Sequence, residues 1–187
     1  MSTMQFHSLA RPIVMVVCAV LFTGCAEQSP VAPARSAQTQ AQRAALPGMD
    51  TDGAIATLQR VTARYHDLDV AKNEGFVLLH ECESRPGEGP VGIVYVNPGR
   101  LMDGKIDPEL PDALIYEPIR NSRPRLVGAE FAIPYALAPG GQAPTFLGAT
   151  FQNEEEFGVF ALHAWIWRNN PTGLFAETNP KVSCDAE

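Results

Sequence analysis

Imidazole, indole and carboxylate side chains gather in the C-terminal third of the chain. If residues 159–167 form a strand, side chains alternate between faces, so His163, Trp165 and Trp167 share one face and apolar residues the other. Tryptophan and histidine combine an apolar body with a polar tip, which suits a partly buried concave binding site. The alternative is packing alone, with the tryptophans under a helix and the histidine satisfied by a neighbour.

Glu130 is a second unusual residue, because it lies within the apolar run 126–133. In a central strand this carboxylate needs a partner or a raised pKa. We expect His163 or Arg168 on a neighbouring strand to be that partner, whereas in an edge strand Glu130 would face water. Glu117 follows another short apolar run, and we expect it to cap a loop or, alternatively, to stand at the rim of a pocket.

Familiar catalytic and cofactor motifs are missing from the sequence. It contains no phosphate-binding loop, nucleophile elbow, zinc-protease helix or haem-attachment motif. The run 102–107 lacks the spacing and distal glutamate of a calcium loop, so Asp103-Gly104 predicts a turn. The acidic run 154–156 predicts a solvated loop. The motifs therefore assign no catalytic residue, metal or cofactor.

The first 24 residues are organised as a secretory signal. Arg11 precedes an apolar run, 13–22, of about half the length needed to cross a bilayer core. The next residues, 22–25, resemble the lipobox of bacterial lipoproteins, with Phe22 where leucine is usual. We therefore expect cleavage before Cys25 and lipidation of Cys25, which would anchor the chain on a membrane. A secretory signal followed by a chance cysteine is the alternative.

The lipidated cysteine also defines the expected domain plan and location. Ala26 follows Cys25 in place of aspartate, which by enterobacterial sorting rules favours the outer membrane, facing the periplasm, if the cell has one. Residues 26–48 are rich in Ala, Gln, Ser and Pro, without aromatic residues, and predict a flexible tether. The plan is a signal peptide (1–24), a tether from Cys25 (25–48) and one domain (49–187).

Charge and cysteine content limit the partners and the chemistry. Without residues 1–24 the chain has 13 basic and 21 acidic residues, a net charge near -8, which argues against nucleic acid as a partner. After loss of Cys18 and lipidation of Cys25, only Cys82 and Cys184 remain for a disulfide. Such a bridge closes a loop of about 100 residues, worth roughly 4–5 kcal/mol. Two free thiols or a metal pair are the alternatives, although neither cysteine has metal-ligand spacing.

Helix signals come first in the domain and strand signals follow. Asp50 or Asp52 can cap a helix whose apolar residues recur at helical spacing to Tyr65, and a second helical turn, 69–74, ends at Gly75. Short β-type runs follow at 76–80, 92–96, 113–116, 126–133, 145–151 and 159–167, with Pro- and Gly-rich turns at 85–90 and 138–141. This order predicts an α+β fold, an N-terminal helix followed by a mainly antiparallel, curved β-sheet; a small β-barrel with a covering helix is the alternative.

The chain from Glu74 to Cys184 resembles a family of uncharacterised bacterial secreted proteins and lipoproteins. The matching runs are GIVYVNP at 92–98, LIYEP at 114–118, LVGAEF at 126–131, HAWIWRNNPTGLF at 163–175 and NPKVSC at 179–184. The resemblance implies no activity. Two histidines and two glutamates of the family pattern would be a credible divalent-metal set. Val94 stands where the pattern has one of those histidines, and the spacing of His66 and His80 does not assign either as a replacement.

These features favour a membrane-anchored extracytoplasmic lipoprotein that binds a small ligand or another envelope protein. The candidate ligand-binding residues are Glu117, Glu130, His163, Trp165, Trp167 and Arg168. The alternative is an enzyme or metal-dependent protein using Glu130 and His163, with Glu117 as a further candidate, which requires these side chains to converge in one concave pocket. A structural lipoprotein without a small-molecule site is the third hypothesis.

Overall fold

The computed structural model describes residues 50–185. The predicted signal peptide, the lipidated Cys25 and the tether lie outside this range. None of the helices within it has the length and apolar character needed to cross a membrane. The helical elements are α2 (Thr51–Thr62), η1 (Ala63–His66), α3 (Leu68–Asn73), α4 (Pro98–Leu101) and η2 (Pro139–Gly141).

The N-terminal helices form where the sequence signals place them. Asp50 caps α2, since its side chain accepts a hydrogen bond from the Gly53 amide at 2.8 Å. Of the two predicted caps, the structure therefore uses the first. Leu58 and Tyr65 are buried as the helical spacing predicted. The second helix ends before Gly75, whose φ of 92° is readily adopted only by glycine.

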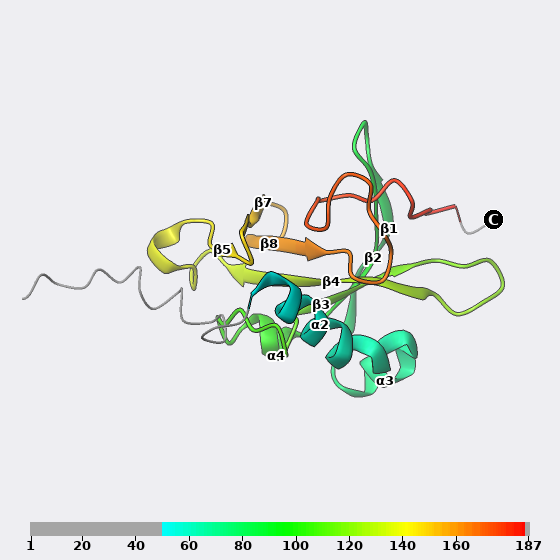
Figure 1. Ribbon diagram of the computed structural model, residues 1–187, viewed down its shortest axis with the longest axis horizontal. Coiled ribbons are helices and arrows are strands. Elements are labelled where there is room, and N and C mark those ends of the chain that lie inside the picture. Colours follow the sequence, from blue (N-terminus) through cyan, green and yellow to red (C-terminus); the bar gives the residue numbers. More distant parts are fainter. Residues whose placement is uncertain (1–49, 186–187) are drawn as a thin grey trace, which may run out of the picture. The chain divides into compact units, whose positions relative to one another are not determined.

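A curled antiparallel sheet follows the helices (Figure 1). It has six strands in the order β1-β2-β3-β4-β8-β7, and each pair of neighbours is antiparallel. The sheet forms a half-barrel, which confirms the predicted α+β fold with a curved sheet. The strands are β1 (Val77–Arg85), β2 (Gly89–Val96), β3 (Ala113–Glu117), β4 (Arg125–Pro134), β7 (Gln152–Glu154) and β8 (Val159–Ala164), and a separate hairpin consists of β5 (Thr145–Phe146) and β6 (Ala149–Thr150).

Two predicted strands are longer than the strands that form, and a third, 76–80, is shorter than β1. The run 145–151 is interrupted, because Leu147 and Gly148 have positive φ values of 52° and 80° and make a tight turn between β5 and β6. The strand predicted for 159–167 ends at Ala164. After it, the Ile166 amide donates a hydrogen bond to the Ala164 carbonyl, and the chain turns away from the strand direction. The side-chain alternation predicted beyond Ala164 is therefore lost.

The two faces of the sheet have different coverings. The helix face packs against α2, η1 and α3 in a core that includes Leu58, Tyr116 and Phe131. The opposite face, here called the pocket face, presents Val94 and Ile115 beside Trp165. It also carries Glu130 and His163, which are paired across β4 and β8.

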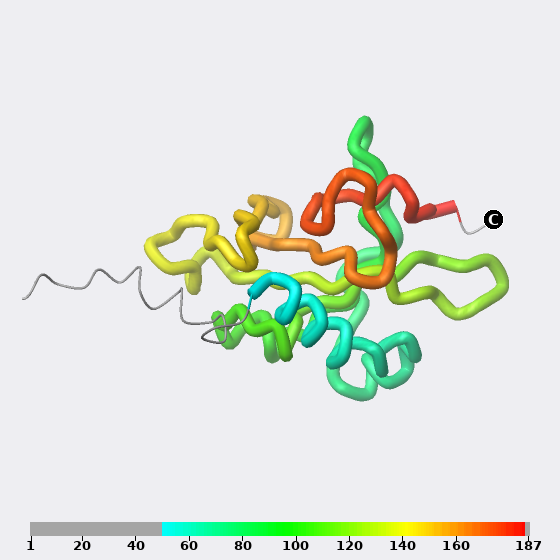
Figure 2. The backbone as a smooth tube through the Cα atoms, in the orientation of Figure 1, coloured from blue at the N-terminus to red at the C-terminus, as the bar shows by residue number. Residues whose placement is uncertain are grey.

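The chain after β8, residues 165–185, crosses back to the hairpin of β1 and β2 and is here called the C-terminal strap. Figure 2 shows it beside that hairpin. The Asn179 amide donates to the Pro90 carbonyl at 2.9 Å, and the Thr178 hydroxyl donates to the Glu88 carbonyl at 2.7 Å. The predicted disulfide between Cys82 and Cys184 is confirmed, with 5.3 Å between the Cα atoms. The strap is thus fixed to the sheet at its far end.

Candidate functional site

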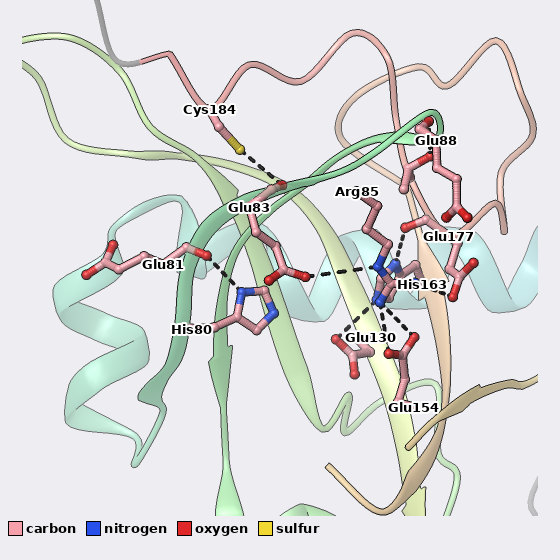
Figure 3. Close-up of polar contacts among 11 residues, drawn as sticks. His80, Glu81, Glu83, Arg85, Glu88, Glu130, Glu154, His163, Glu177 and Cys184 are labelled. Carbon is pink, nitrogen blue, oxygen red and sulfur yellow. Dashed lines mark hydrogen bonds and ion pairs between the residues drawn. The ribbon is translucent and has the colours of Figure 1, made fainter. Parts of the chain in front are cut away.

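A pocket of about 140 Å³ lies on the pocket face, between the two ends of the curled sheet. Its polar lining comes from four strands: His80 and Arg85 on β1, Glu130 on β4, Glu154 on β7 and His163 on β8. Its apolar wall includes Val91, Val96, Leu101, Ala132 and Val159. Figure 3 shows the side chains of Arg85, Glu130, Glu154 and His163 close together.

Glu130 and His163 are more deeply buried than Arg85 and Glu154 in the polar lining. They are direct partners in the β4–β8 register, and His163 Nε2 lies 3.5 Å from Glu130 Oε2. Both side chains are more than nine-tenths buried. The contact is longer than a usual N–H···O hydrogen bond, so we describe it as an ion pair. Of the two partners expected for Glu130, His163 is therefore the one that the structure supplies.

The surroundings of His163 favour its charged form. Its Nδ1 lies 2.6 Å from the Glu177 carbonyl oxygen, while Nε2 faces the Glu130 carboxylate. Burial by itself would lower the pKa of His163, but the Glu130 carboxylate and the Glu177 carbonyl raise it by more, and the net pKa is raised. Each ring nitrogen faces an acceptor, so the protonated imidazolium fits this environment.

Arg85 joins the first and last strands of the sheet. Its Nη2 donates to both carboxylate oxygens of Glu154, at 3.0 and 2.8 Å, and its Nη1 pairs with Glu177. Burial raises the pKa of Glu154, although the neighbouring guanidinium opposes that effect. The prediction of a solvated loop is thus wrong for Glu154. The sequence offered no signal for Arg85, because only the curl of the sheet brings β1 to β7.

Only one of the two predicted tryptophans belongs to this face. Trp165 lies edge-on to His163, with 5.9 Å between ring centroids, and its indole donates to the Ala176 carbonyl at 2.6 Å. Trp167 instead donates to the Thr62 hydroxyl on the helix side at 3.1 Å. The predicted face shared by both indoles is therefore not formed, since the strand ends before them.

Glu117 and Arg168 hold the C-terminal strap rather than the pocket. Glu117 is buried, pairs with Arg125 at 2.5 Å and accepts a hydrogen bond from the Ser183 amide at 3.1 Å. Arg168 donates to the Lys181 carbonyl at 3.0 and 2.6 Å. The structure does not place either residue in the pocket, so the convergence of Glu117 with Glu130 and His163 does not occur.

Asp112 is a buried acid near the pocket that sequence reasoning missed. Its side chain accepts a hydrogen bond from the Ala132 amide at 2.9 Å. Burial raises its pKa to about 8, with a further contribution from the charge of Glu130. Residues 50–185 contain no group of three or more His, Cys, Asp or Glu side chains arranged to hold a metal ion.

A wider depression beside α2 contains an exposed ion pair. It is lined by Arg60, Arg64 and Glu109, and the Arg60–Glu109 ion pair within it is more than half exposed. Exposed pairs of this kind contribute little and impose no defined geometry. The pocket between the ends of the sheet is therefore the candidate functional site.

No protein-family model, curated protein or solved structure matches this chain.

Proposed function

We propose that the protein is a membrane-anchored extracytoplasmic lipoprotein that binds a small ligand in the pocket between the ends of its curled sheet. The observation that carries the proposal is Glu130, a carboxylate more than nine-tenths buried that lines this pocket. Its one polar side-chain partner among residues 50–185 is His163, whose Nε2 lies 3.5 Å from Glu130 Oε2 and whose pKa this contact raises. A buried acceptor in this state favours a ligand that brings a donor.

The size of the pocket supports a small ligand. A cavity of about 150 Å³ is large enough to hold a benzene molecule, and this pocket has about 140 Å³. The ligand, or the part of it that enters, therefore has about six heavy atoms. Larger metabolites need pockets of roughly 300 Å³ or more.

The lining supports binding rather than covalent catalysis. It contains no serine, threonine, cysteine or lysine, and its two carboxylates, Glu130 and Glu154, are paired with His163 and Arg85. His163 has both ring nitrogens directed at protein acceptors, so neither is turned to a substrate as a general base.

Native mass spectrometry of the purified protein tests ligand binding. Two variants are compared with the parent, each replacing one alanine by leucine. Ala132→Leu fills the pocket from β4, whereas Ala136→Leu makes that change at an exposed position. We expect the parent and Ala136→Leu proteins to retain or acquire a small molecule and the Ala132→Leu protein to lose it. A ligand that persists in Ala132→Leu, or a parent that binds nothing from a metabolite mixture, would contradict the proposal.

The membrane anchor is tested through its own cysteine. Cys25→Ser should abolish incorporation of labelled palmitate and release the protein from the membrane fraction. Cys18→Ser is the matched control, because Cys18 belongs to the expected signal peptide, and it should leave both unchanged. Palmitate on the Cys25→Ser protein would refute anchoring at this position.

A further inference from the structure

We propose that the pocket selects a small organic cation, an alkylammonium group whose N–H donors bind the Glu130 carboxylate. This inference rests on the proposed binding function and names the chemical class of its ligand. It follows from which hydrogen-bonding groups of the pocket are already used and which are not.

The cationic side chains of the pocket are committed to protein acceptors. Arg85 directs Nη2 at Glu154 and Nη1 at Glu177. His163 directs Nδ1 at the Glu177 carbonyl and Nε2 at Glu130. An anionic ligand that approached the remaining N–H groups of Arg85 would meet the carboxylates of Glu154 and Glu177, which already surround this guanidinium.

The unused capacity is on the acceptor side. The one polar side-chain partner of Glu130 among the described residues is His163 Nε2, 3.5 Å from Oε2, so most of the roughly four acceptor sites of the carboxylate remain available to a ligand. Around the pocket, the carboxylates of Glu130, Glu154 and Glu177 outnumber the cations of Arg85 and protonated His163, and Glu83 adds a further negative charge 4.0 Å from Arg85 Nε. An ammonium ion bound at Glu130 would reduce this excess of negative charge and supply further donors, and charge-assisted hydrogen bonds of this kind are strong.

The rest of the lining suits an alkyl chain. Val96, Ala132 and Val159 form an apolar wall beside Glu130. His80 and Phe157 stack at the exposed side, with ring centroids 5.9 Å apart, and Phe157 is 39% exposed. With about 140 Å³ available, a chain of four carbons and one nitrogen fits. Either a free aliphatic amine or the end of a lysine side chain has this shape.

Titration calorimetry with three probes of equal length tests the inference: n-butylammonium, n-butanol and butyrate. We expect n-butylammonium to bind at least tenfold more tightly than n-butanol, and butyrate not to bind. Glu130→Gln should weaken n-butylammonium binding at least tenfold. Glu156→Gln makes the same charge change at an exposed position outside the pocket and should bind as the parent does. Thermal unfolding of each variant confirms that it is folded before titration.

The outcomes separate this inference from the proposed function. If n-butanol or butyrate binds as tightly as n-butylammonium and Ala132→Leu blocks it, the pocket binds ligands but the cation class is wrong. If Glu130→Gln is folded and binds n-butylammonium unchanged, the role of Glu130 is wrong. If no probe binds, the cation inference fails, and native mass spectrometry decides separately on the proposed function. A lysine capped at both ends that binds as tightly as n-butylammonium would support the cation class with a protein side chain as its source; weaker binding would support a free amine.

Discussion

Arg85 on β1 and Glu154 on β7 are joined by two hydrogen bonds from one guanidinium nitrogen, at 2.8 and 3.0 Å, across the open side of the half-barrel. His80 and Phe157 stack across the same opening. Exposed strand edges are sites where other chains can add by hydrogen bonding. In this protein, side chains rather than backbone hydrogen bonds connect the two edges, which leaves space between them for the pocket.

Arg85→Met tests the connection between the edges. The substitution leaves Glu154 and Glu177 without their countercharge at a site where the side chains are only 13–33% exposed. We expect the free energy of unfolding, measured in urea, to fall by about 2 kcal/mol, between the values typical of surface and buried pairs. Arg123→Met is the control: Arg123 pairs with Asp67 and Asp69 but is 68% exposed, and its loss should cost less than about 1 kcal/mol. Equal losses would contradict the special role of Arg85.

Asp112 should make stability depend on pH. Because its pKa is about 8 in the folded protein and near 3.8 in the unfolded chain, the folded state holds the proton more tightly. This contribution is complete below pH 3.8 and is lost as the pH rises to about 8, at up to about 1.4 kcal/mol per pH unit. Asp112→Asn keeps an acceptor for the Ala132 amide and cannot ionise. Its stability relative to the parent should therefore rise between about pH 4 and about pH 8, and the same substitution at the exposed Asp52 is the matched control.

The pKa of His163 should depend on the charge of Glu130. NMR of the imidazole protons should show a raised pKa for His163 in the parent, and a lower one in Glu130→Gln, because burial then acts against the charged ring with less compensation. Since the folded state binds this proton more tightly, the stabilisation is complete below the unfolded pKa of about 6.5 and is lost as the pH rises through the folded pKa. His66 contacts Trp167 and serves as an internal control. An unchanged His163 titration in Glu130→Gln would show that the pair is not electrostatically coupled.

Removing the disulfide should lower the free energy of unfolding. Cys82 and Cys184 are 102 residues apart in the sequence, and the chain-entropy model assigns roughly 4–5 kcal/mol to a bridge over such a loop. The double variant Cys82→Ser/Cys184→Ser should lose about that much unfolding free energy. A reductant should destabilise the parent similarly and leave the double variant unaffected. A double variant as stable as the parent would mean that the strap is held by its other contacts alone.

His163→Gln should strengthen binding of n-butylammonium if the proposed cation site is correct. Protonated His163 shares the Glu130 carboxylate with the incoming ammonium and repels it. The glutamine side chain in this variant is neutral, so affinity should rise severalfold at about pH 6, and the rise should be smaller at about pH 9, where the parent imidazole carries less charge. Calorimetry at both pH values measures this. Weaker binding at both would indicate that His163 contributes to ligand binding instead of competing.

Local signals in the sequence predicted much of the fold but only part of the site. The Asp50 cap and the Gly75 helix end depend on residues within one or two turns, and both are where the sequence placed them. The pairing of Glu130 with His163 could be predicted, because a carboxylate in an apolar strand requires a partner. The contact between Arg85 and Glu154 could not be predicted, because it depends on how strongly the whole six-stranded sheet curves. The placement of Trp167 failed because alternation holds only while the strand continues.

The C-terminal strap follows every strand of the sheet in the sequence. It supplies Glu177, whose carbonyl binds His163 and whose carboxylate binds Arg85, and its Cys184 is bonded to Cys82 on β1. The sheet strands precede it in synthesis and can pair before it arrives. The charged lining of the pocket is therefore completed only after residue 177 has been synthesised and the strap has packed against the sheet. A chain truncated before residue 177 would retain every strand of the sheet but would leave Arg85 and His163 without one of their shared partners.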